Sequence, residues 1–432
     1  MVIAMTGRMV LREMYLSRLR EMRGLFSVAK VIMGIRRCGK STLLGQYISE
    51  LLESGVPESD IISIDFNEPS NQHLHDIKAL NAHLLEVIPT DHPSYLFLDE
   101  VQLVKGWERT VAGLCDRGNV DIYITGSNGH LLSNELTTMI TGRYVEIPML
   151  PPSFHEFVAL YEDEADRNKL LDMYLHDGTV LLTDPFMYPT TRTDLLKGLS
   201  DSIIVEDISS RESTPNPNTT RKIARFLFSN IGNETSISKI AEGIGSSSPT
   251  VEKYIDALLA AGLFMYAEKY DIVGSKLLRT NGKYYATDMG LRRVNLNQHE
   301  LKDLSRPIEN LVFLELIRRG YEVCVGSYRG REIDFQATRG DTTEYFQVCQ
   351  TMLSEDTRER EFRSLDDMKN SIPKTIITGD AIGLGNFGGI RVVNLIDWLL
   401  DDGTTPRVVP APTSWRIGRI SIANDRACHR NK

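Results

Sequence analysis

The sequence predicts an α/β protein with a parallel sheet and a phosphate-binding loop, and three observations predict this class. An apolar strand at residues 29–33 leads directly into a glycine-containing loop at residues 34–41. A second apolar strand, at residues 94–98, runs into Asp99 and Glu100. Near-continuous apolar strands alternate with helical patterns, which is typical of a parallel sheet covered on both faces.

The loop has the sequence Gly34-Ile-Arg-Arg-Cys-Gly-Lys-Ser41 and is followed by a helical segment. Its glycines let backbone N–H groups turn toward phosphate oxygens, Lys40 adds a positive charge, and the Ser41 hydroxyl is placed to reach Mg²⁺. We therefore expect a nucleoside triphosphate to bind here. The expected contacts are Gly34, Arg36, Arg37, Cys38, Gly39, Lys40, Ser41 and Thr42.

The acidic pair at the end of the second strand supplies the other half of such a site. Asp99 is expected to hold the metal ion together with Ser41, and Glu100 to activate the attacking water. The alternative for an acidic pair after a strand is a surface turn. The phosphate loop about sixty residues upstream favours the metal site.

Further elements follow in order, with a short helix at residues 15–24 and strands at 61–66, 120–125 and 144–147. Ligands bind beyond the carboxyl ends of such strands, where the turn Thr125-Gly-Ser-Asn128 also emerges. Asn128 is a candidate to orient the water or sense the γ-phosphate, and its alternative role is turn formation. Arg143 is a candidate cationic finger on the γ-phosphate, and otherwise a surface arginine.

Composition agrees with a multi-domain protein that works inside the cell. The chain has 432 residues, 41% of them hydrophobic and 25% charged, with a formal net charge of -9. No segment has the roughly 20 apolar residues needed to cross a bilayer, and the first residues lack the apolar core of a signal peptide. The five cysteines are far apart, which argues against disulfides or zinc. A cytoplasmic location without membrane contact is expected.

Several segments resemble a family of prokaryotic AAA-type ATPases over nearly the whole chain. These are GIRRCGKSTLL, LFLDEVQ, ITGSNGHLLS, TGRY and PPSFHEF. The resemblance implies ATP and Mg²⁺ as cofactors, an ATPase core over residues 1–150 and a small helical lid over 151–211. It also implies Lys40 and Ser41 on phosphates and Mg²⁺, with Asp99 on the metal. Glu100 would act on water, Asn128 as sensor and Arg143 as finger.

A Pro- and Asn-rich stretch at residues 212–220 marks a domain boundary. Three helical patterns and a strand pair after it predict a winged helix over residues 221–290, a module that binds DNA or proteins. The third helix exposes Glu252, Lys253 and Asp256, a poor match to DNA phosphates, whereas the hairpin offers Lys276, Arg279 and Lys283. A protein-docking or purely structural module is favoured, and DNA reading stays open.

The last domain, at residues 300–402, resembles the restriction-endonuclease-like fold, with a helix at 307–320 and strands at 322–326, 332–335 and 343–349. Active nucleases of that type place a helix glutamate, a strand aspartate and a Glu-x-Lys around Mg²⁺. Here Glu309 or Glu315 and Asp334 remain, but the third strand reads Gln347-Val-Cys349. An amide and a thiol bind Mg²⁺ and polarise water poorly, so a degenerate recognition domain is favoured over a nuclease.

The segment at residues 404–432 is rich in arginine and is expected to be a loose, basic tail, for which a nucleic-acid role stays open. Taken together, the patterns predict ATP hydrolysis that drives a conformational change used in partner recognition or regulation. An unidentified protein is the favoured partner. A nucleotide-gated DNA-binding regulator and a metal-dependent nuclease are the alternatives, and oligomerisation is expected if Arg143 acts on a neighbouring subunit.

Overall fold

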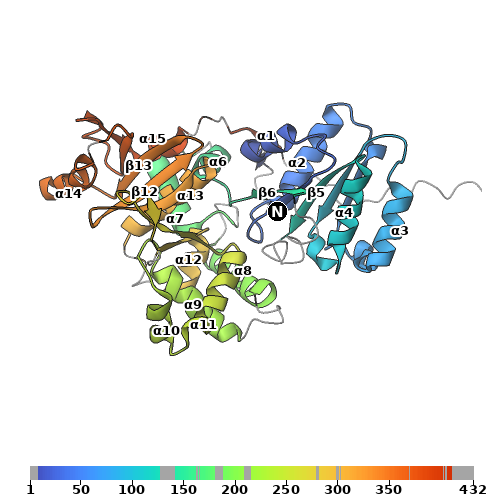
Figure 1. Cartoon of the computed structure of the whole chain (residues 1–432), viewed down its shortest axis with the longest axis horizontal. Helices are drawn as coiled ribbons and strands as arrows, with labels where there is room; N and C mark the ends of the chain where they lie inside the picture. Colours follow the sequence, from blue (N-terminus) through green and yellow to red (C-terminus); the bar gives the residue numbers. More distant parts are fainter. Residues whose placement is uncertain are drawn as a thin grey trace, which may run out of the picture.

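The computed structural model places two sheets at opposite ends of the molecule, with a group of helices below and between them (Figure 1). None of the helices in the described ranges is both long and apolar enough to cross a membrane. The described residues are 8–126, 142–161, 164, 166–180, 188–208, 216–278, 282–297, 301, 303–368, 370–401, 403 and 406–410.

The N-terminal sheet has five parallel strands, as the sequence predicts. Alternate strand side chains point to opposite faces, so Ile32, Phe97 and Tyr123 join one apolar core and their neighbours join another. In spatial order the strands are β3 (Ile61–Asp65), β4 (Ser94–Asp99), β5 (Val120–Gly126), β2 (Ala29–Met33) and β6 (Tyr144–Pro148). Helices α1 (Glu13–Glu21) and α2 (Lys40–Glu53) cover the first face, and α3 (Ile77–Val87) and α4 (Trp107–Arg117) cover the second.

Helices follow the sheet in the region expected to form the lid. Helix α6 (Phe154–Leu160) begins with a capping box, in which Ser153 accepts from the N–H of Glu156 and the Glu156 side chain accepts from the N–H of Ser153. Helix α7 (Arg167–Asp177) follows it, and α8 (Pro189–Ser202) continues into a π-helical turn at Ile203–Ile208.

Three helices and a strand pair come next. They are α9 (Pro217–Ser229), α10 (Ile237–Ile244) and α11 (Ser248–Ala260), with β7 (Phe264–Ala267) antiparallel to β10 (Lys283–Ala286). The segment between these strands continues the antiparallel hairpin. It forms β8 (Lys269–Asp271) and β9 (Lys276–Leu277), which join the C-terminal sheet, with β8 parallel to β11. Helix α12 (Met289–Asn295) then contacts α7, α8 and α9.

The C-terminal sheet has eight strands in the order β15-β16-β14-β13-β12-β11-β8-β9. Helices α13 (Ser305–Arg318) and α15 (Leu395–Leu400) share one apolar core with the sheet, whereas the core on the other side includes Leu365 of α14 (Glu355–Asp366). The remaining strands are β11 (Glu322–Tyr328), β12 (Arg331–Arg339), β13 (Thr342–Cys349), β14 (Lys374–Thr378), β15 (Gly385–Phe387) and β16 (Ile390–Asn394).

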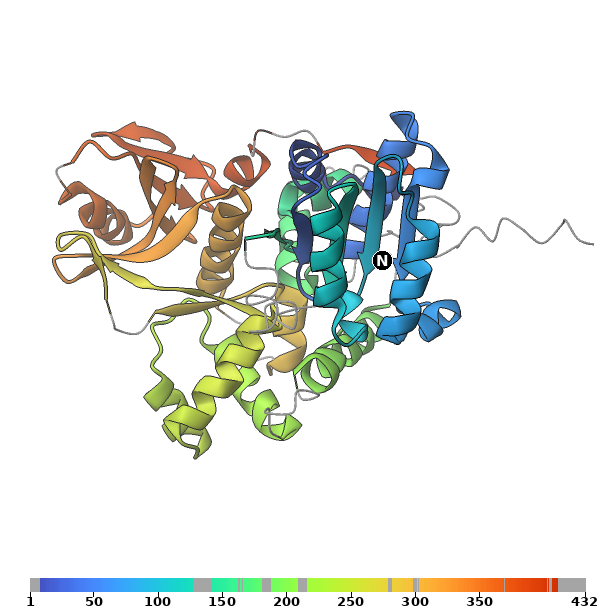
Figure 2. The ribbon, with the colours of Figure 1, turned by 45° about the vertical axis from the view of Figure 1, so that its right-hand side comes forward.

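A two-stranded pair joins the first and last described segments of the chain (Figure 2). Strand β1 (Arg8–Val10) is antiparallel to β17 (Val408–Pro410), and β1 also contacts α6. Residues 408–410 therefore differ from the loose segment expected over 404–432. The part of that expectation that concerns residues 411–432 lies outside the described residues.

Candidate functional site

The loop between β2 and α2 lies at the carboxyl edge of the N-terminal sheet. Its backbone geometry requires glycine at two positions. Gly39 has a φ of 105°, a value that residues with a side chain rarely adopt. At Gly34, a Cβ atom would lie 2.2 Å from the carbonyl oxygen of Met149, so only glycine lets the segment after β6 approach this closely. Both glycines of the predicted phosphate loop thus have a structural requirement.

Lys40 and the start of α2 give the loop its positive character. The Lys40 side chain is buried, its Nζ donates to the carbonyl oxygen of Gly34 at 2.9 Å, and it lies 3.8 Å from the Glu100 carboxylate. The backbone N–H groups in the first turn of a helix have no intrahelical acceptor and favour anions. An anion at the start of α2 would therefore meet both the ammonium group and these N–H groups.

Asp99 ends β4 and has the properties of a cation ligand. Its side chain is 1% exposed, its Oδ1 accepts a hydrogen bond from the Thr125 hydroxyl, and its Oδ2 has no hydrogen-bond partner among the described residues. Burial raises the pKa of Asp99 to about 6, although the hydroxyl groups of Ser41 and Thr125 act in the opposite direction. The free carboxylate oxygen and the Ser41 hydroxyl fit the oxygen ligands that Mg²⁺ prefers.

Glu100 follows Asp99 in a left-handed backbone conformation with a φ of 58°, which is uncommon for a residue with a side chain. Its N–H donates to the Thr125 hydroxyl at 3.1 Å, and its carboxylate accepts from the Gln102 amide at 2.5 Å. These two hydrogen bonds hold Glu100 in its left-handed conformation. Its carboxylate is thereby kept close to Lys40 and Asp99.

Three further residues take part in this site without having been assigned a role from the sequence. Asp65 ends β3 directly beside Asp99, and burial raises its pKa. Thr125 contacts both members of the acidic pair. Asp65 and Thr125 are polar residues at strand carboxyl ends, and this position in the sequence indicates a ligand site. The third, Arg12, follows β1 and carried no such signal.

Arg12 connects the loop to the helices that follow the sheet. Its guanidinium group is 1% exposed and donates to the carbonyl oxygens of Cys38 at 2.9 Å and Leu150 at 2.8 Å. It also forms an ion pair with Glu156 of α6 at 3.0 Å. A second link joins Arg36 of the loop to Glu206 of the π-helical turn, at 2.7 Å. Arg37 is exposed, and Cys38 and Thr42 are buried.

For two predicted residues, no place at this edge of the sheet is described. Asn128 lies outside the described residues. Arg143 precedes β6 and therefore lies at the amino edge, opposite the loop, where it is 44% exposed and pairs with Asp116 at 2.6 Å. Its guanidinium group is thus remote from the phosphate loop of its own chain.

Comparison with known proteins agrees with this geometry. Residues 27–158 match the model of an AAA domain, and residues 187–302 match that of a domain of unknown function (DUF8612). An uncharacterized protein of Haemophilus influenzae is 37% identical over 408 residues, which is 92% of this chain and 100% of that protein. This chain belongs to the same family. Its N-terminal part is an AAA-type P-loop ATPase domain.

More distant similarities involve archaeal proteins. Uncharacterized protein MJ1544 of Methanocaldococcus jannaschii is 29% identical over 364 residues, 78% of each chain. Among solved structures, the Walker-type ATPase paby2304 of Pyrococcus abyssi aligns with a TM-score of 0.46 and 16% identity, over 66% of this chain and 95% of that one.

A second polar cluster lies outside the AAA domain, where α13 meets β10 and β12. Lys283 of β10 donates to Glu309 at 3.0 Å and to Glu332 at 2.7 Å, and the Tyr285 hydroxyl donates to Glu309 at 2.8 Å. Asp334 lies nearby, and burial raises its pKa well above the usual range. The positive charge of this cluster therefore comes from Lys283 on β10. Active nucleases of the type considered above carry this charge on a lysine at the position that Cys349 occupies here.

The other residues of the expected nuclease-like set have structural partners. The Gln347 side chain accepts from the Asp334 N–H at 3.3 Å, and Asp334 accepts from the Val348 N–H at 2.8 Å. Glu315 instead forms ion pairs with Arg318 and Arg319. In the described ranges, no group of three or more His, Cys, Asp or Glu side chains is arranged to hold a metal ion. Of the two glutamates considered from the sequence, Glu309 is the one in the cluster.

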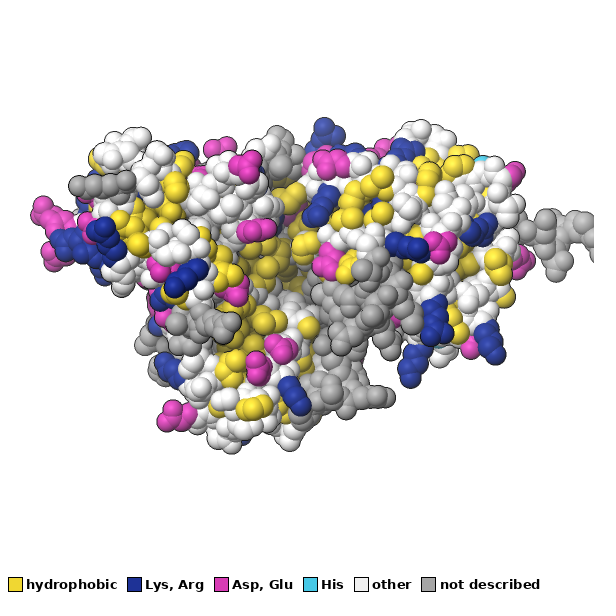
Figure 3. All heavy atoms as spheres, in the orientation of Figure 1, with side chains coloured by type: hydrophobic (Ala, Val, Ile, Leu, Met, Phe, Trp, Pro, Cys, Tyr) yellow, Lys and Arg dark blue, Asp and Glu magenta, His cyan; other side chains and the backbone are white. Residues whose placement is uncertain are grey.

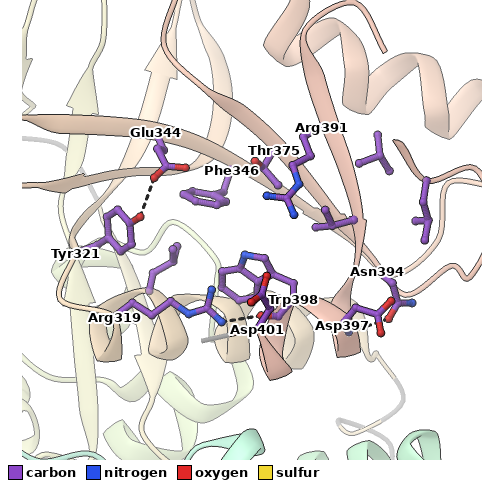
Figure 4. A pocket seen from close by; sticks show the side chains of 14 residues that line it. Arg319, Tyr321, Glu344, Phe346, Thr375, Arg391, Asn394, Asp397, Trp398 and Asp401 are labelled. Carbon is purple, nitrogen blue, oxygen red and sulfur yellow. Dashed lines mark hydrogen bonds between the residues drawn. The ribbon is translucent and has the colours of Figure 1, made fainter. Parts of the chain in front are cut away.

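The C-terminal sheet also carries a pocket of about 410 Å³ beside α13 and α15 (Figure 4). The guanidinium carbon of Arg319 lies 4.0 Å from the centroid of the Trp398 ring, and the Tyr321 hydroxyl donates to Glu344 at 2.7 Å. Arg391 lines the same pocket. Because charges of both signs line it, this pocket singles out no class of ligand.

Proposed function

We propose that the chain binds Mg²⁺-ATP at the phosphate loop, hydrolyses it, and uses the change of nucleotide state to alter recognition of a protein partner. The observation that carries the proposal is the Asp99 carboxylate, whose buried Oδ2 has no hydrogen-bond partner among the described residues and whose pKa the Ser41 hydroxyl lowers against the effect of burial. A buried carboxylate oxygen without a hydrogen bond is costly, and a bound cation would offset that cost.

Each residue of the site has a role in this proposal. Lys40 and the first N–H groups of α2 would hold the phosphates, and Ser41 and Asp99 would hold Mg²⁺, which supplies charge neutralisation at the transferred phosphoryl group. Glu100 would accept a proton from the attacking water, because its backbone and its hydrogen bond to Gln102 fix its carboxylate near Lys40. Asn128 is proposed as the γ-phosphate sensor.

The coupling to a partner rests on the links between the loop and the rest of the chain. Arg12 bonds the carbonyl oxygen of Cys38, which is inside the loop, and also pairs with Glu156 of α6. Arg36 pairs with Glu206. A nucleotide that changes the position of the loop would therefore act on the lid, for which we propose residues 151–211.

A protein partner is favoured over DNA by the surroundings of Lys283. We propose a winged helix over residues 221–290 and a degenerate nuclease-like domain over 300–402. One of the hairpin residues expected to meet phosphates, Lys283, is 3% exposed and neutralised by carboxylates. Stimulation of ATP turnover by duplex DNA, with a steep loss on adding salt, would instead favour the DNA-binding regulator.

Two substitutions test the proposed ATPase. Lys40→Ala is expected to abolish binding of a fluorescent ATP analogue, because the phosphates lose their buried cation. Glu100→Gln is expected to bind the analogue normally but to release phosphate at least about 100-fold more slowly, since a general base contributes roughly 10²–10⁴-fold. Phosphate release by Glu100→Gln at the wild-type rate would refute the assigned role of Glu100. Undiminished binding by Lys40→Ala would refute the site.

A further inference from the structure

An apolar cavity of about 290 Å³ lies where the AAA domain meets the helical and C-terminal parts. Figure 3 shows apolar side chains gathered where these parts of the molecule meet. We call this space the junction cavity. Its walls come from α1, the start of the phosphate loop, the segment after β6, the end of α11 with β7, and the end of α13. The volume is close to the lower end of the range for small-molecule sites, about 300 Å³.

The charges around the junction cavity have one sign. Among its described lining residues the charged ones are Arg18 and Arg318, and none is acidic. Arg18 is exposed, and its guanidinium group donates to the carbonyl oxygen of Glu146 at 3.3 Å. Arg318 is 6% exposed, and its Nε–H has no acceptor among the described residues. An anionic group at the cavity would therefore meet one guanidinium at the surface and a donor that lacks a partner inside.

On α13, Arg318 shares its carboxylate partner with Arg319, which lines the pocket beside α15. Glu315 pairs with Arg318 at 2.7 Å and with Arg319 at 2.9 Å, so two guanidinium groups share one carboxylate. Buried positive charge without full compensation favours an anionic ligand. Apolar walls with this charge fit a small molecule that has an apolar body and a single acidic group.

The junction cavity also borders the phosphate loop directly. Gly34 and Ile35 form part of its wall, and a Cβ atom on Gly262, after α11, would lie 3.3 Å from the Ile35 nitrogen. The loop and the α11–β7 turn are therefore in close contact along this wall. A molecule held between them would restrict how the loop moves relative to α11.

We propose that the junction cavity binds an amphipathic anion, an acyl or aromatic body with one acidic head group, and that its occupancy changes the affinity of the loop for nucleotide. The second part rests on the proposed function, whereas the first does not.

The binding test uses the full chain and the probe 8-anilinonaphthalene-1-sulfonate, which becomes fluorescent in apolar sites. Saturable binding of the probe is expected. Two variants should each weaken its affinity roughly tenfold, which corresponds to about 1.4 kcal/mol. Ala260→Phe fills the cavity, and Arg18→Glu reverses the charge of an exposed residue that lines it. Because Arg18 is exposed, this variant keeps the test valid if Ala260→Phe does not fold.

Arg109→Glu is the matched control, because Arg109 lines a separate open groove of about 710 Å³ between α3 and α4. Probe binding that is lost in Arg109→Glu but kept in the two cavity variants would overturn the proposal, as would fluorescence that never saturates. Octanoate is expected to displace the probe from the wild-type chain several-fold better than octanol or octylamine. Equal displacement by all three compounds would overturn the anionic character.

The coupling is measured separately, with a fluorescent ATP analogue titrated in the presence and absence of octanoate. A change in affinity of at least about twofold is expected in the wild type and none in Ala260→Phe. Intact probe binding with unchanged nucleotide affinity would refute the coupling. Absence of any nucleotide binding, with intact probe binding, would refute the proposed function and leave the site standing.

Discussion

At the scale of single residues, Asp99 destabilises the nucleotide-free fold, because its carboxylate is buried without a full set of hydrogen bonds, and the same property suits it to the proposed cation. Its pKa is raised to about 6 from a usual value near 3.8. The folded chain therefore holds this proton more tightly than the unfolded chain does, and the carboxyl destabilises the fold as the pH rises through that interval.

Asp99→Asn is expected to stabilise the nucleotide-free protein at pH 8, by up to about 3 kcal/mol, because it removes a buried charge while keeping an acceptor for Thr125. At pH 4 the difference should largely disappear. Thermal unfolding of both proteins at the two pH values checks this. A wild type as stable as the variant at pH 8 would contradict it, and the variant should also lose Mg²⁺-dependent nucleotide binding.

Removal of the Arg12 side chain is expected to lower the free energy of unfolding far more than removal of a surface arginine such as Arg20. Arg12→Ala leaves Glu156 and two backbone carbonyl oxygens without their donor, and breaking such a buried pair costs about 3–5 kcal/mol. Arg20→Ala is the control, because Arg20 forms ion pairs at the surface of α1, where the cost is below about 1 kcal/mol. Denaturant unfolding of both variants gives the comparison, and equal losses would refute the role of Arg12.

At the scale of elements, local patterns predicted much of what the structure contains. The five strands of the AAA domain and its phosphate loop follow from apolar runs and glycine spacing, which act over a few residues. The positions of Asp99 and Glu100 followed too, because parallel strands end at one edge. Arg12 was not predicted, since its partners Cys38 and Leu150 are distant in sequence and a lone arginine has no periodic pattern.

The second polar cluster shows the same limit. The sequence indicated that a lysine was missing beside Gln347, but it could not show that Lys283 of β10 would reach Glu309. Likewise, the expected hairpin is present, as β7 with β10 and β8 with β9, but the sequence could not show that β8 would also pair with β11, a segment distant in the chain. Contacts of this kind depend on the assembled fold.

Lys283→Gln is expected to destabilise the protein by roughly 3–5 kcal/mol, because Glu309 and Asp334 lose their counter-charge. Burial raises the pKa of both carboxyl groups, so they are protonated at low pH and the loss should be larger at pH 8 than at pH 5. Thermal unfolding at both pH values measures it. Lys276→Gln, on the exposed tip of the same hairpin, is the matched control, and similar effects of the two substitutions would argue against the cluster.

At the scale of the whole molecule, a role of Arg143 as a cationic finger would require assembly. Arg143 lies at the edge of the sheet opposite the phosphate loop, so a role on the γ-phosphate requires the nucleotide of a neighbouring subunit. Light scattering is expected to show larger particles with ATP than without it. Arg143→Ala should slow turnover at least about 10-fold and leave nucleotide affinity unchanged.

Arg117→Ala, also on the exposed side of the AAA domain, is the control for Arg143. A strictly monomeric chain that hydrolyses ATP at a rate independent of its concentration would exclude a finger from a neighbouring subunit. Wild-type turnover by Arg143→Ala would exclude the residue itself.

The pairing of β1 with β17 has a consequence for biosynthesis. Ribosomes make the residues of β1 almost 400 positions before those of β17, so a nascent chain carries β1 with its partner still unmade. Arg12, two residues beyond β1, anchors the phosphate loop. The strand that precedes Arg12 thus gains its pairing partner only after residues 408–410 have been translated, and a chain that stops before them would leave β1 without that partner.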